Sequence, residues 1–177
     1  MAGNRAGGAT GSRGMRSRCW SWLVVLALTL LVGCDHATKL GAERELRGEA
    51  PTPVVRGVDL AYHQNHGIAF NLERVLPAPG RTAVIVLGGL VALGLLGRAL
   101  WRRRGQVTLE VAGYVLVLAG ALGNLADRLA RGYVVDFIHV HRWPVWNVAD
   151  AWVVMGVGAL MIAGIRAAPP GTPPRGA

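Results

Sequence analysis

The sequence predicts an all-α integral membrane protein with four transmembrane helices. Of its 177 residues, 52% are hydrophobic and only 16% are charged, whereas soluble domains carry about 25% charged residues. Four stretches contain no charged residue at all: 20–34, 82–97, 111–126 and 151–165. With its flanks, each stretch reaches the roughly 20 residues that a helix needs to cross the hydrocarbon core. A helix is expected because lipid offers the backbone no hydrogen-bonding partners.

The first half of the chain contains two of these spans. Residues 1–18 are rich in Gly and Arg and are predicted to be a disordered basic tail. The first span covers about 19–40 and is followed by an outer segment at about 41–80. Apolar residues alternate with others over 58–63 in this segment, which predicts a strand. Pro77, Pro79 and Gly80 indicate a turn before the second span, at about 81–100.

The second half contains the other two spans. The third covers about 107–130, and Gly132 is placed as a helix stop. A short outer loop is expected over 131–143, and Pro144 is expected to start the fourth span, at about 145–166. The Pro- and Gly-rich residues 167–177 form a second predicted disordered tail. Because there is no internal repeat, residues 19–166 are predicted to be one membrane domain.

Arginines predict the orientation. The N-terminal tail holds four arginines and no acid, and the connection after the second span holds four more, at 98 and 102–104. Basic residues concentrate on the cytoplasmic side of membrane proteins, so both segments, and with four spans both termini, are predicted to be cytoplasmic. Topology and contact with lipid headgroups account for the net charge of +9. No nucleic-acid motif is present, and no nucleic-acid partner is predicted.

Carboxylates gather at the outer ends of the predicted spans. A charged residue inside a span costs about 2.5–3.5 kcal/mol on insertion scales, so such residues need an explanation. Asp35 can be neutralised by Lys39 at i+4, and Asp127 has Arg128 beside it, so both are interpreted as structural ion pairs. Helical spacing places Asn124, Asp127 and Arg128 on one face, and Asn147 and Asp150 on another.

Asp136 and Asp150 have no obvious basic partner in the sequence. Two carboxylates held together in a site of low dielectric constant do not both ionise easily, so one retains a proton. Such a pair supplies a general base that activates water and a general acid that protonates the leaving group. This is the chemistry of an aspartic protease.

Two other functions remain open from these residues. Intramembrane carboxylates also occur along ion and proton paths, but here they all lie in the outer half, and a transporter needs polar groups in both halves. Cys34 follows Leu31-Val32-Gly33, a segment similar to the lipobox of bacterial lipoproteins, in which case residues 1–33 would be a cleaved signal. The three later spans argue against such a product.

A metal site is a further alternative. His63, His66, His139 and His141 lie in outer segments and could gather around a cation with Asp136. The histidines show no ordered ligand spacing, so they are interpreted as interfacial loop residues. Cys19 and Cys34 lie near opposite ends of the first span and are too far apart for a disulfide.

Four segments together resemble the lipoprotein signal peptidases, the signal peptidase II family. The family patterns are Asp-Gln-x-Thr-Lys, Asn-x-Gly-Ala-Ala-Phe, Gly-Asn-x-x-Asp-Arg followed by Gly-x-Val-Val-Asp-Phe-Ile, and Phe-Asn-x-Ala-Asp. The matching segments begin at Asp35, Asn65, Gly123 with Gly132, and Trp146. They depart from the patterns at His36, Ile68 and Trp146, and the interval between Asp136 and Asp150 is shorter than expected, which affects the loop at 139–145.

The resemblance implies an activity and a set of roles. Family members cleave diacylglyceryl-modified prolipoproteins just before the lipidated cysteine, at the outer face of the bacterial inner membrane, without a metal or cofactor. The strand near 58–62 would belong to a small extracytoplasmic β-rich cradle. Partners would be the prolipoprotein and the phospholipid bilayer, and nothing requires more than a monomer. The implied catalytic pair is Asp136 and Asp150; the substrate groove is Asn65, Asn124, Arg128 and Asn147; the supporting residues are Asp35, Lys39, Asp127 and Gly67.

Overall fold

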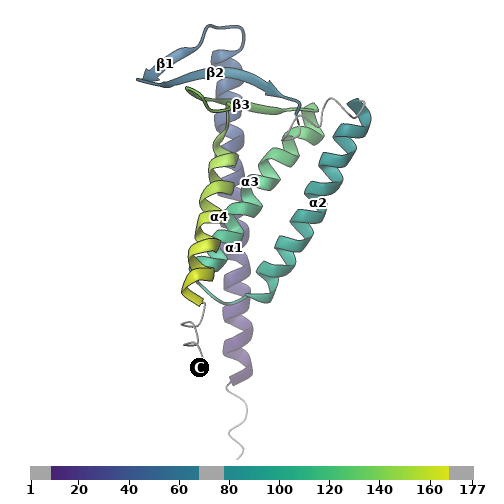
Figure 1. Ribbon diagram of the computed structural model, residues 1–177. Helices are drawn as coiled ribbons and strands as arrows, with labels where there is room; N and C mark the ends of the chain where they lie inside the picture. The colour runs from purple at the N-terminus through teal and green to yellow at the C-terminus, as the bar shows by residue number, and fades with distance from the viewer. Residues whose placement is uncertain (1–8, 68–77, 168–177) are drawn as a thin grey trace, which may run out of the picture.

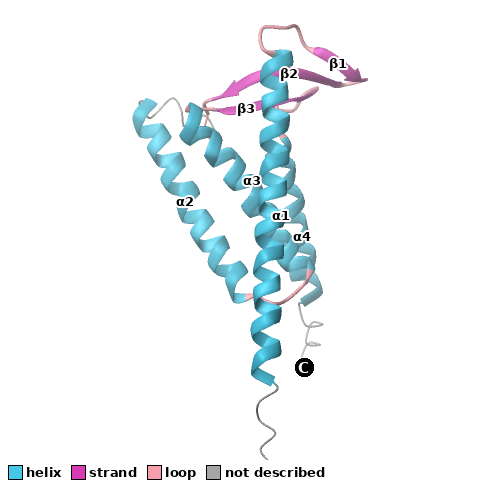
Figure 2. Ribbon diagram, turned by 180° about the vertical axis from the view of Figure 1, so that it is seen from behind, coloured by secondary structure: helices cyan, strands magenta, loops and turns pink. Residues whose placement is uncertain are grey.

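The computed structural model describes residues 9–67 and 78–167, which form four long helices and a three-stranded sheet. The helices lie side by side, and the sheet lies across one end of the bundle (Figures 1 and 2). In chain order the elements are α1 (Ala9–Leu46), β1 (Thr52–Val55), β2 (Val58–Asn65), α2 (Ala78–Arg102), α3 (Leu109–Arg131), β3 (Val134–Val140) and α4 (Val148–Ala167).

Each of the four helices contains a segment long and apolar enough to cross a membrane: Arg18–Leu46, Ala83–Arg102, Leu109–Arg131 and Val148–Ala167. Their outer surfaces are apolar as well, since Leu23, Leu87 and Met161 are each more than 60% exposed in the isolated chain. A bilayer would cover such side chains, and helices satisfy their own backbone hydrogen bonds within it. The predicted fold class of four transmembrane helices is confirmed.

Two helix boundaries differ from the prediction. α1 begins at Ala9, so residues 9–18 are helical although they were assigned to the disordered tail; residues 1–8 and 168–177 lie outside the described residues. α4 begins at Val148, and Pro144 lies in the loop before it. The side-chain oxygen of Asn147 accepts from the backbone N–H of Asp150 at 3.0 Å. Asn147 is therefore the helix cap, a role that asparagine fills well.

The sheet has the order β1-β2-β3 with antiparallel pairing throughout. β2 contains the predicted strand, but β3 occupies a segment that was expected to be a loop. Val134, Val135 and Phe137 are buried on both faces of β3, so apolar and polar residues do not alternate and the strand pattern is hidden. A register shift between Leu60 and His63 places His63 opposite Asp136. The sheet thereby carries Asp136 to the end of the bundle.

α3 packs against all three other helices, and its contact with α4 is the most extensive. Small residues allow this contact: a Cβ on Gly120 would overlap the carbonyl oxygen of Ala149, and one on Gly156 would lie 2.8 Å from the carbonyl oxygen of Gly113. Helices in membranes approach closely where such residues meet. Close packing brings the N-terminal end of α4 against α3. Gly132 ends α3 in the left-handed conformation (φ 79°), as predicted.

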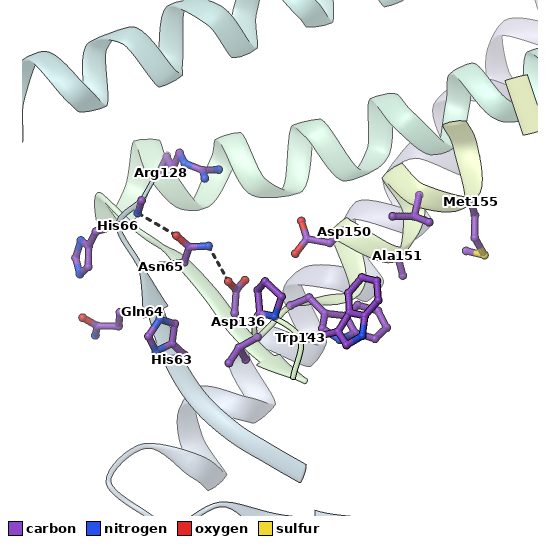
Figure 3. A pocket seen from close by; sticks show the side chains of 15 residues that line it. His63, Gln64, Asn65, His66, Arg128, Asp136, Trp143, Asp150, Ala151 and Met155 are labelled. Atoms are coloured by element: carbon purple, nitrogen blue, oxygen red, sulfur yellow. Dashed lines mark hydrogen bonds between the residues drawn. The ribbon is translucent and has the colours of Figure 1, made fainter. Parts of the chain in front are cut away.

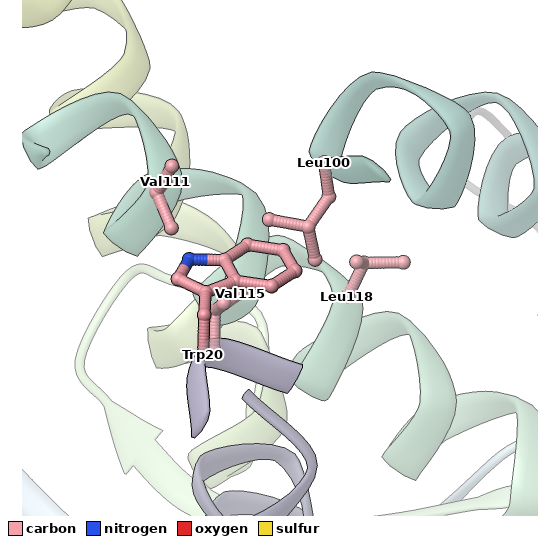
Figure 4. Close-up of a cluster of buried hydrophobic side chains, with 5 residues drawn as sticks. All are labelled: Trp20, Leu100, Val111, Val115 and Leu118. Carbon is pink, nitrogen blue, oxygen red and sulfur yellow. The ribbon is translucent and has the colours of Figure 1, made fainter. Parts of the chain in front are cut away.

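A cluster of buried apolar side chains joins the helices at the end opposite the sheet (Figure 4). Trp20 from α1 packs there, and its indole N–H donates to the carbonyl oxygen of Gln106 at 2.8 Å. This bond ties α1 to the connection between α2 and α3. The other members of the cluster are Leu100, Val111, Val115 and Leu118.

Candidate active site

A pocket with a volume of about 1180 Å³ lies where the sheet meets α3 and α4. Asp136 and Asp150 both line it, together with Asn65, Gly67 and Arg128 (Figure 3). The remaining wall toward α4 is mostly apolar and is formed by Trp143, Pro144, Val145, Trp146, Ala151, Val154 and Met155. The structure therefore brings the two unpartnered aspartates of the sequence into one cavity.

Asp136 is the more enclosed of the two carboxylates, with 1% of its surface exposed. Its Oδ1 accepts from Nδ2 of Asn147 at 2.6 Å, and its Oδ2 accepts from Nδ2 of Asn65 at 2.9 Å. Burial raises the pKa of Asp136 above its ordinary value, and the nearby charge of Asp150 raises it further, while the two amide donors lower it. The net direction is upward, which favours retention of a proton.

Asp150 is half-buried and lies in the first turn of α4. Its Oδ1 accepts from Nδ2 of Asn124 at 2.8 Å, and its Oδ2 accepts from the backbone N–H of Asn147 at 3.2 Å. Because Asn147 also accepts from the backbone N–H of Asp150, the two residues form a reciprocal capping box. The start of α4 therefore holds the Asp150 carboxylate in place.

Backbone N–H groups determine which way two of the asparagine amides point. Oδ1 of Asn65 accepts from the N–H of Gly67 at 2.9 Å, and Oδ1 of Asn147 accepts from the N–H of Asp150. Since an amide oxygen cannot donate, the NH₂ group of each must face away from these partners, toward Asp136. Asp136 thus receives two donors of fixed direction. Asn147 links both aspartates.

A buried lysine determines the direction of the third amide. Nζ of Lys39 donates to Oδ1 of Asn124 at 2.9 Å, which turns the NH₂ group of Asn124 toward Asp150. The same ammonium contacts Asp35 Oδ2 at 2.8 Å and Asp127 Oδ2 at 3.0 Å. Three acceptors satisfy its three N–H bonds, although Lys39 is 0% exposed. The predicted pair of Asp35 with Lys39 is confirmed.

The predicted pair of Asp127 with Arg128 is wrong. Asp127 contacts Lys39, and its Oδ1 lies 3.8 Å from Nε of Arg131, whereas Arg128 lines the pocket and donates to the carbonyl oxygen of Asn124 at 3.3 Å. Consecutive residues of an α-helix point about 100° apart, so neighbours in sequence face different surroundings. Within the described part of the chain, no Lys or Arg side-chain nitrogen forms an ion pair within 4 Å of the carboxylate oxygens of Asp136 or Asp150.

Comparison with known proteins decides the family. The sequence model of the signal peptidase II family matches residues 27–166. The chain belongs to the signal peptidase II family. It is 35% identical over 144 residues to a lipoprotein signal peptidase of Halothermothrix orenii, covering 80% of this chain and 92% of that protein. It is 37% identical over 147 residues to one of Acinetobacter baumannii, covering 81% of each.

A solved structure shows the same fold. A bacterial membrane enzyme determined by the in meso method at 1.9 Å resolution superposes with a TM-score of 0.73 at 24% sequence identity. The match covers 82% of this chain and 94% of that chain. Membership of the signal peptidase II family makes the chain a peptidase of the membrane.

The family assignment bears on the other sequence hypotheses. α1 runs unbroken through Cys34, and the family match begins at residue 27, so a lipoprotein cleaved before Cys34 would lose part of the matched region. Asp35, the next residue, is part of the network around Lys39. The proton-path hypothesis gains no support from membership of a peptidase family.

The histidines of this signal peptidase II family member do not form the metal site that was considered. His63 and His66 line the pocket, whereas His139 and His141 stack on each other with ring centroids 5.8 Å apart. Across residues 9–67 and 78–167, no group of three or more His, Cys, Asp or Glu is placed to hold a metal ion.

Two supporting residues were missed by sequence reasoning. A Cβ on Gly123 would lie 2.6 Å from Oδ2 of Asp35, so this position cannot carry a larger side chain without displacing the carboxylate. The backbone N–H of Ala149 donates to Oδ1 of Asp35 at 2.8 Å. Gly123 begins the Gly-Asn-x-x-Asp-Arg pattern, which was the available signal. Nothing in the sequence marks Ala149, because its contribution is a backbone group.

Proposed function

We propose that this protein is a membrane-embedded aspartic endopeptidase that removes signal peptides from diacylglyceryl-modified prolipoproteins, cleaving before the lipidated cysteine. Asp136 and Asp150 are its catalytic pair. The observation that carries the proposal is their arrangement: both line one cavity beside Arg128, both are bonded to Asn147, and neither forms an ion pair with a Lys or Arg among the described residues. The similar proteins named lipoprotein signal peptidases support this substrate class.

The surroundings of the two carboxylates suggest how they divide the work. Asp136 is buried and has a raised pKa, so it holds the proton. Asp150 is more open to the cavity than Asp136 and is held by Asn124 and by the backbone N–H of Asn147, so it takes the role of general base. Asp150 removes a proton from water, and the resulting hydroxide attacks the scissile carbonyl carbon. Asp136 then donates its proton to the leaving amine, and the C–N bond breaks.

The pocket walls suggest how a lipidated substrate lies. The apolar side chains of Trp143, Val154 and Met155 line the same pocket as Asp150, where they suit the acyl chains of the diacylglyceryl group. Arg128 offers guanidinium N–H donors, and Asn65 and Gly67 border the sheet side of the cavity. A peptide extended along this side would place its scissile bond between the two carboxylates.

The position of the site agrees with cleavage at the outer membrane face. A helix rises about 1.5 Å per residue and the hydrocarbon core is about 30 Å thick. If Trp22 marks one boundary of the hydrocarbon core, the opposite boundary falls near Ala42. Asp35 then lies within the core, about 10 Å from that second boundary. The N-terminal part of α1, which holds Arg18, and the end of α2 with the connection to α3, which hold arginines 98 and 102–104, lie at the end of the bundle away from the sheet. This distribution supports cytoplasmic termini and an extracytoplasmic site in the inner membrane.

The test is cleavage of a diacylglyceryl-modified prolipoprotein in detergent or liposomes, with the unlipidated precursor alongside. Asp136→Asn and Asp150→Asn should each lower kcat by at least about 10²-fold, because each removes a proton-transfer group. Asp59→Asn is a matched control, since Asp59 is on β2 but does not line the pocket. Normal cleavage by either active-site variant would remove that residue from the mechanism. Equal cleavage of the unlipidated precursor would overturn the substrate class.

A further inference from the structure

A second pocket lies at the end of the bundle opposite Asp136 and Asp150. Its volume is about 400 Å³, within the range of about 300–1,000 Å³ that is usual for ligand sites. α1 contributes Arg18, Ser21 and Trp22, and the end of α2 with the residue pair beyond it contributes Trp101 and Arg104. Each of the two chain segments therefore supplies one arginine and one tryptophan.

The two walls of this pocket are held in fixed positions. Between Arg18 and Trp22, the buried Trp20 packs in the apolar cluster with Leu100, the residue before Trp101 (Figure 4). The bond from Trp20 to the carbonyl oxygen of Gln106 anchors the same region. The guanidinium of Arg104 lies 5.1 Å from the ring centroid of Trp101. The backbone N–H of Arg104 also donates to the Trp101 carbonyl oxygen at 3.2 Å.

The charge of the pocket is not neutralised by the described part of the chain. The nearest acid in sequence, Glu110, is already paired with Arg103 at 3.0 Å. No lining residue is acidic, and neither Arg18 nor Arg104 has a carboxylate within 4 Å among the residues that the structure describes. Two guanidinium groups therefore face one small cavity, which favours an anion that accepts hydrogen bonds from several N–H groups.

The pocket lies where the apolar spans end. The first span begins at Arg18 and the second ends at Arg102, so the lining residues sit at the level of the headgroups. Trp22 and Trp101 are 72% and 59% exposed in the isolated chain, and tryptophan is enriched at membrane interfaces because one part of its ring is apolar and another is polar. A ligand here would meet arginines at its charged end and indole rings beside its apolar end.

We propose that this pocket binds the phosphate of an anionic phospholipid from the leaflet opposite the active site. Arg18 and Arg104 hold the phosphate, and Trp22 and Trp101 flank the glycerol and the first methylenes of the acyl chains. Basic pockets at the ends of transmembrane helices bind anionic headgroups in this way. The bound lipid bridges α1 and the end of α2, which both line this pocket.

Native mass spectrometry of the full-length protein in detergent can measure the binding. Phosphatidylglycerol is titrated against wild type, Arg18→Gln/Arg104→Gln and the control Arg98→Gln/Arg102→Gln. The control removes two arginines from the same end of the bundle, neither of which lines the pocket. A charge-assisted hydrogen bond to phosphate contributes at least about tenfold to binding, so the pocket variant should bind the first lipid about 100-fold more weakly. The control changes only the general surface charge and should weaken binding much less.

Three outcomes would overturn the proposal. If both double variants lose phosphatidylglycerol binding equally, general surface charge explains the binding. If wild type retains phosphatidylcholine as well as phosphatidylglycerol, the net charge of the headgroup is not recognised. Displacement of the lipid by the same concentration of glycerol 3-phosphate would indicate a site for a soluble anion. The pocket variant should still cleave prolipoprotein, because Arg18 and Arg104 lie at the far end of the bundle from Asp136 and Asp150. Failure of lipid binding can therefore be told apart from failure of the peptidase proposal.

Discussion

Lys39 is the residue whose replacement should most clearly expose the electrostatics of the site. It is the buried cation that contacts both Asp35 and Asp127, and these two carboxylates are each 1% exposed. At about 3 Å and an effective dielectric constant of about 20, each attraction is roughly 5–6 kcal/mol. Desolvation of the ions offsets much of this, so removing the cation from a buried pair costs about 3–5 kcal/mol.

Lys39→Met retains most of the apolar volume and removes the charge. We expect the free energy of unfolding to fall by about 3–5 kcal/mol, because two buried carboxylates lose their common partner. Arg47→Met is the matched control. Arg47, the residue after the end of α1, also forms an i,i+4 pair, with Glu43 at 3.4 Å, but its side chain is 60% exposed, and such pairs contribute about 0–1 kcal/mol.

Unfolding by titration with SDS in mixed micelles measures the difference between these variants. The triple variant Lys39→Met/Asp35→Asn/Asp127→Asn removes all three charges and should recover most of the lost stability, since neutral replacements of a buried ion group are often tolerated. A loss below about 1 kcal/mol for Lys39→Met, or a triple variant no more stable than the single one, would show that the buried charges are not the source of the effect.

Three further predictions concern the groups around the aspartates. Gly123→Ala should destabilise the protein by about 1–3 kcal/mol in the same titration, because its Cβ would lie 2.6 Å from the Asp35 carboxylate; Gly94→Ala, whose Cβ would meet no atom within 4 Å, should not. Asn147→Asp keeps an oxygen that caps α4 but places a buried carboxyl group against Asp136 in place of the amide donor, so kcat should fall at least tenfold and the free energy of unfolding by about 1–3 kcal/mol; an unchanged kcat would contradict this. Because the pKa of Asp136 is raised in the folded state, its favourable contribution is present below its unfolded pKa and is lost as pH rises through the folded pKa. The melting temperature of Asp136→Asn relative to wild type should therefore increase from pH 4 to pH 8, and a constant difference would refute the assignment.

Much of the fold and most of the site followed from the sequence because their causes are local. Uncharged runs of bilayer length predict the four spans, and their outer ends hold the aspartates. β3 was missed because Val134-Val135-Asp136-Phe137 is buried on both faces and lacks alternation. The partner of Asp127 was missed because Lys39 is distant in sequence and reaches it only after α1 packs on α3. The start of α4 predicted from Pro144 was wrong, because the capping bonds of Asn147 determine that boundary.

The two catalytic candidates become different because they arrive from different parts of the fold. Asp136 comes with β3 and is enclosed by Asn65 from the neighbouring strand, whereas Asp150 comes with the first turn of α4 and is bonded to Asn124 from α3. The paired site therefore exists only when the sheet is docked on the helix bundle, and Asn147 is the residue bonded to both sides. From this arrangement we expect substitutions that weaken the sheet to lower activity before they unfold the helices, because the bundle alone holds one of the two carboxylates.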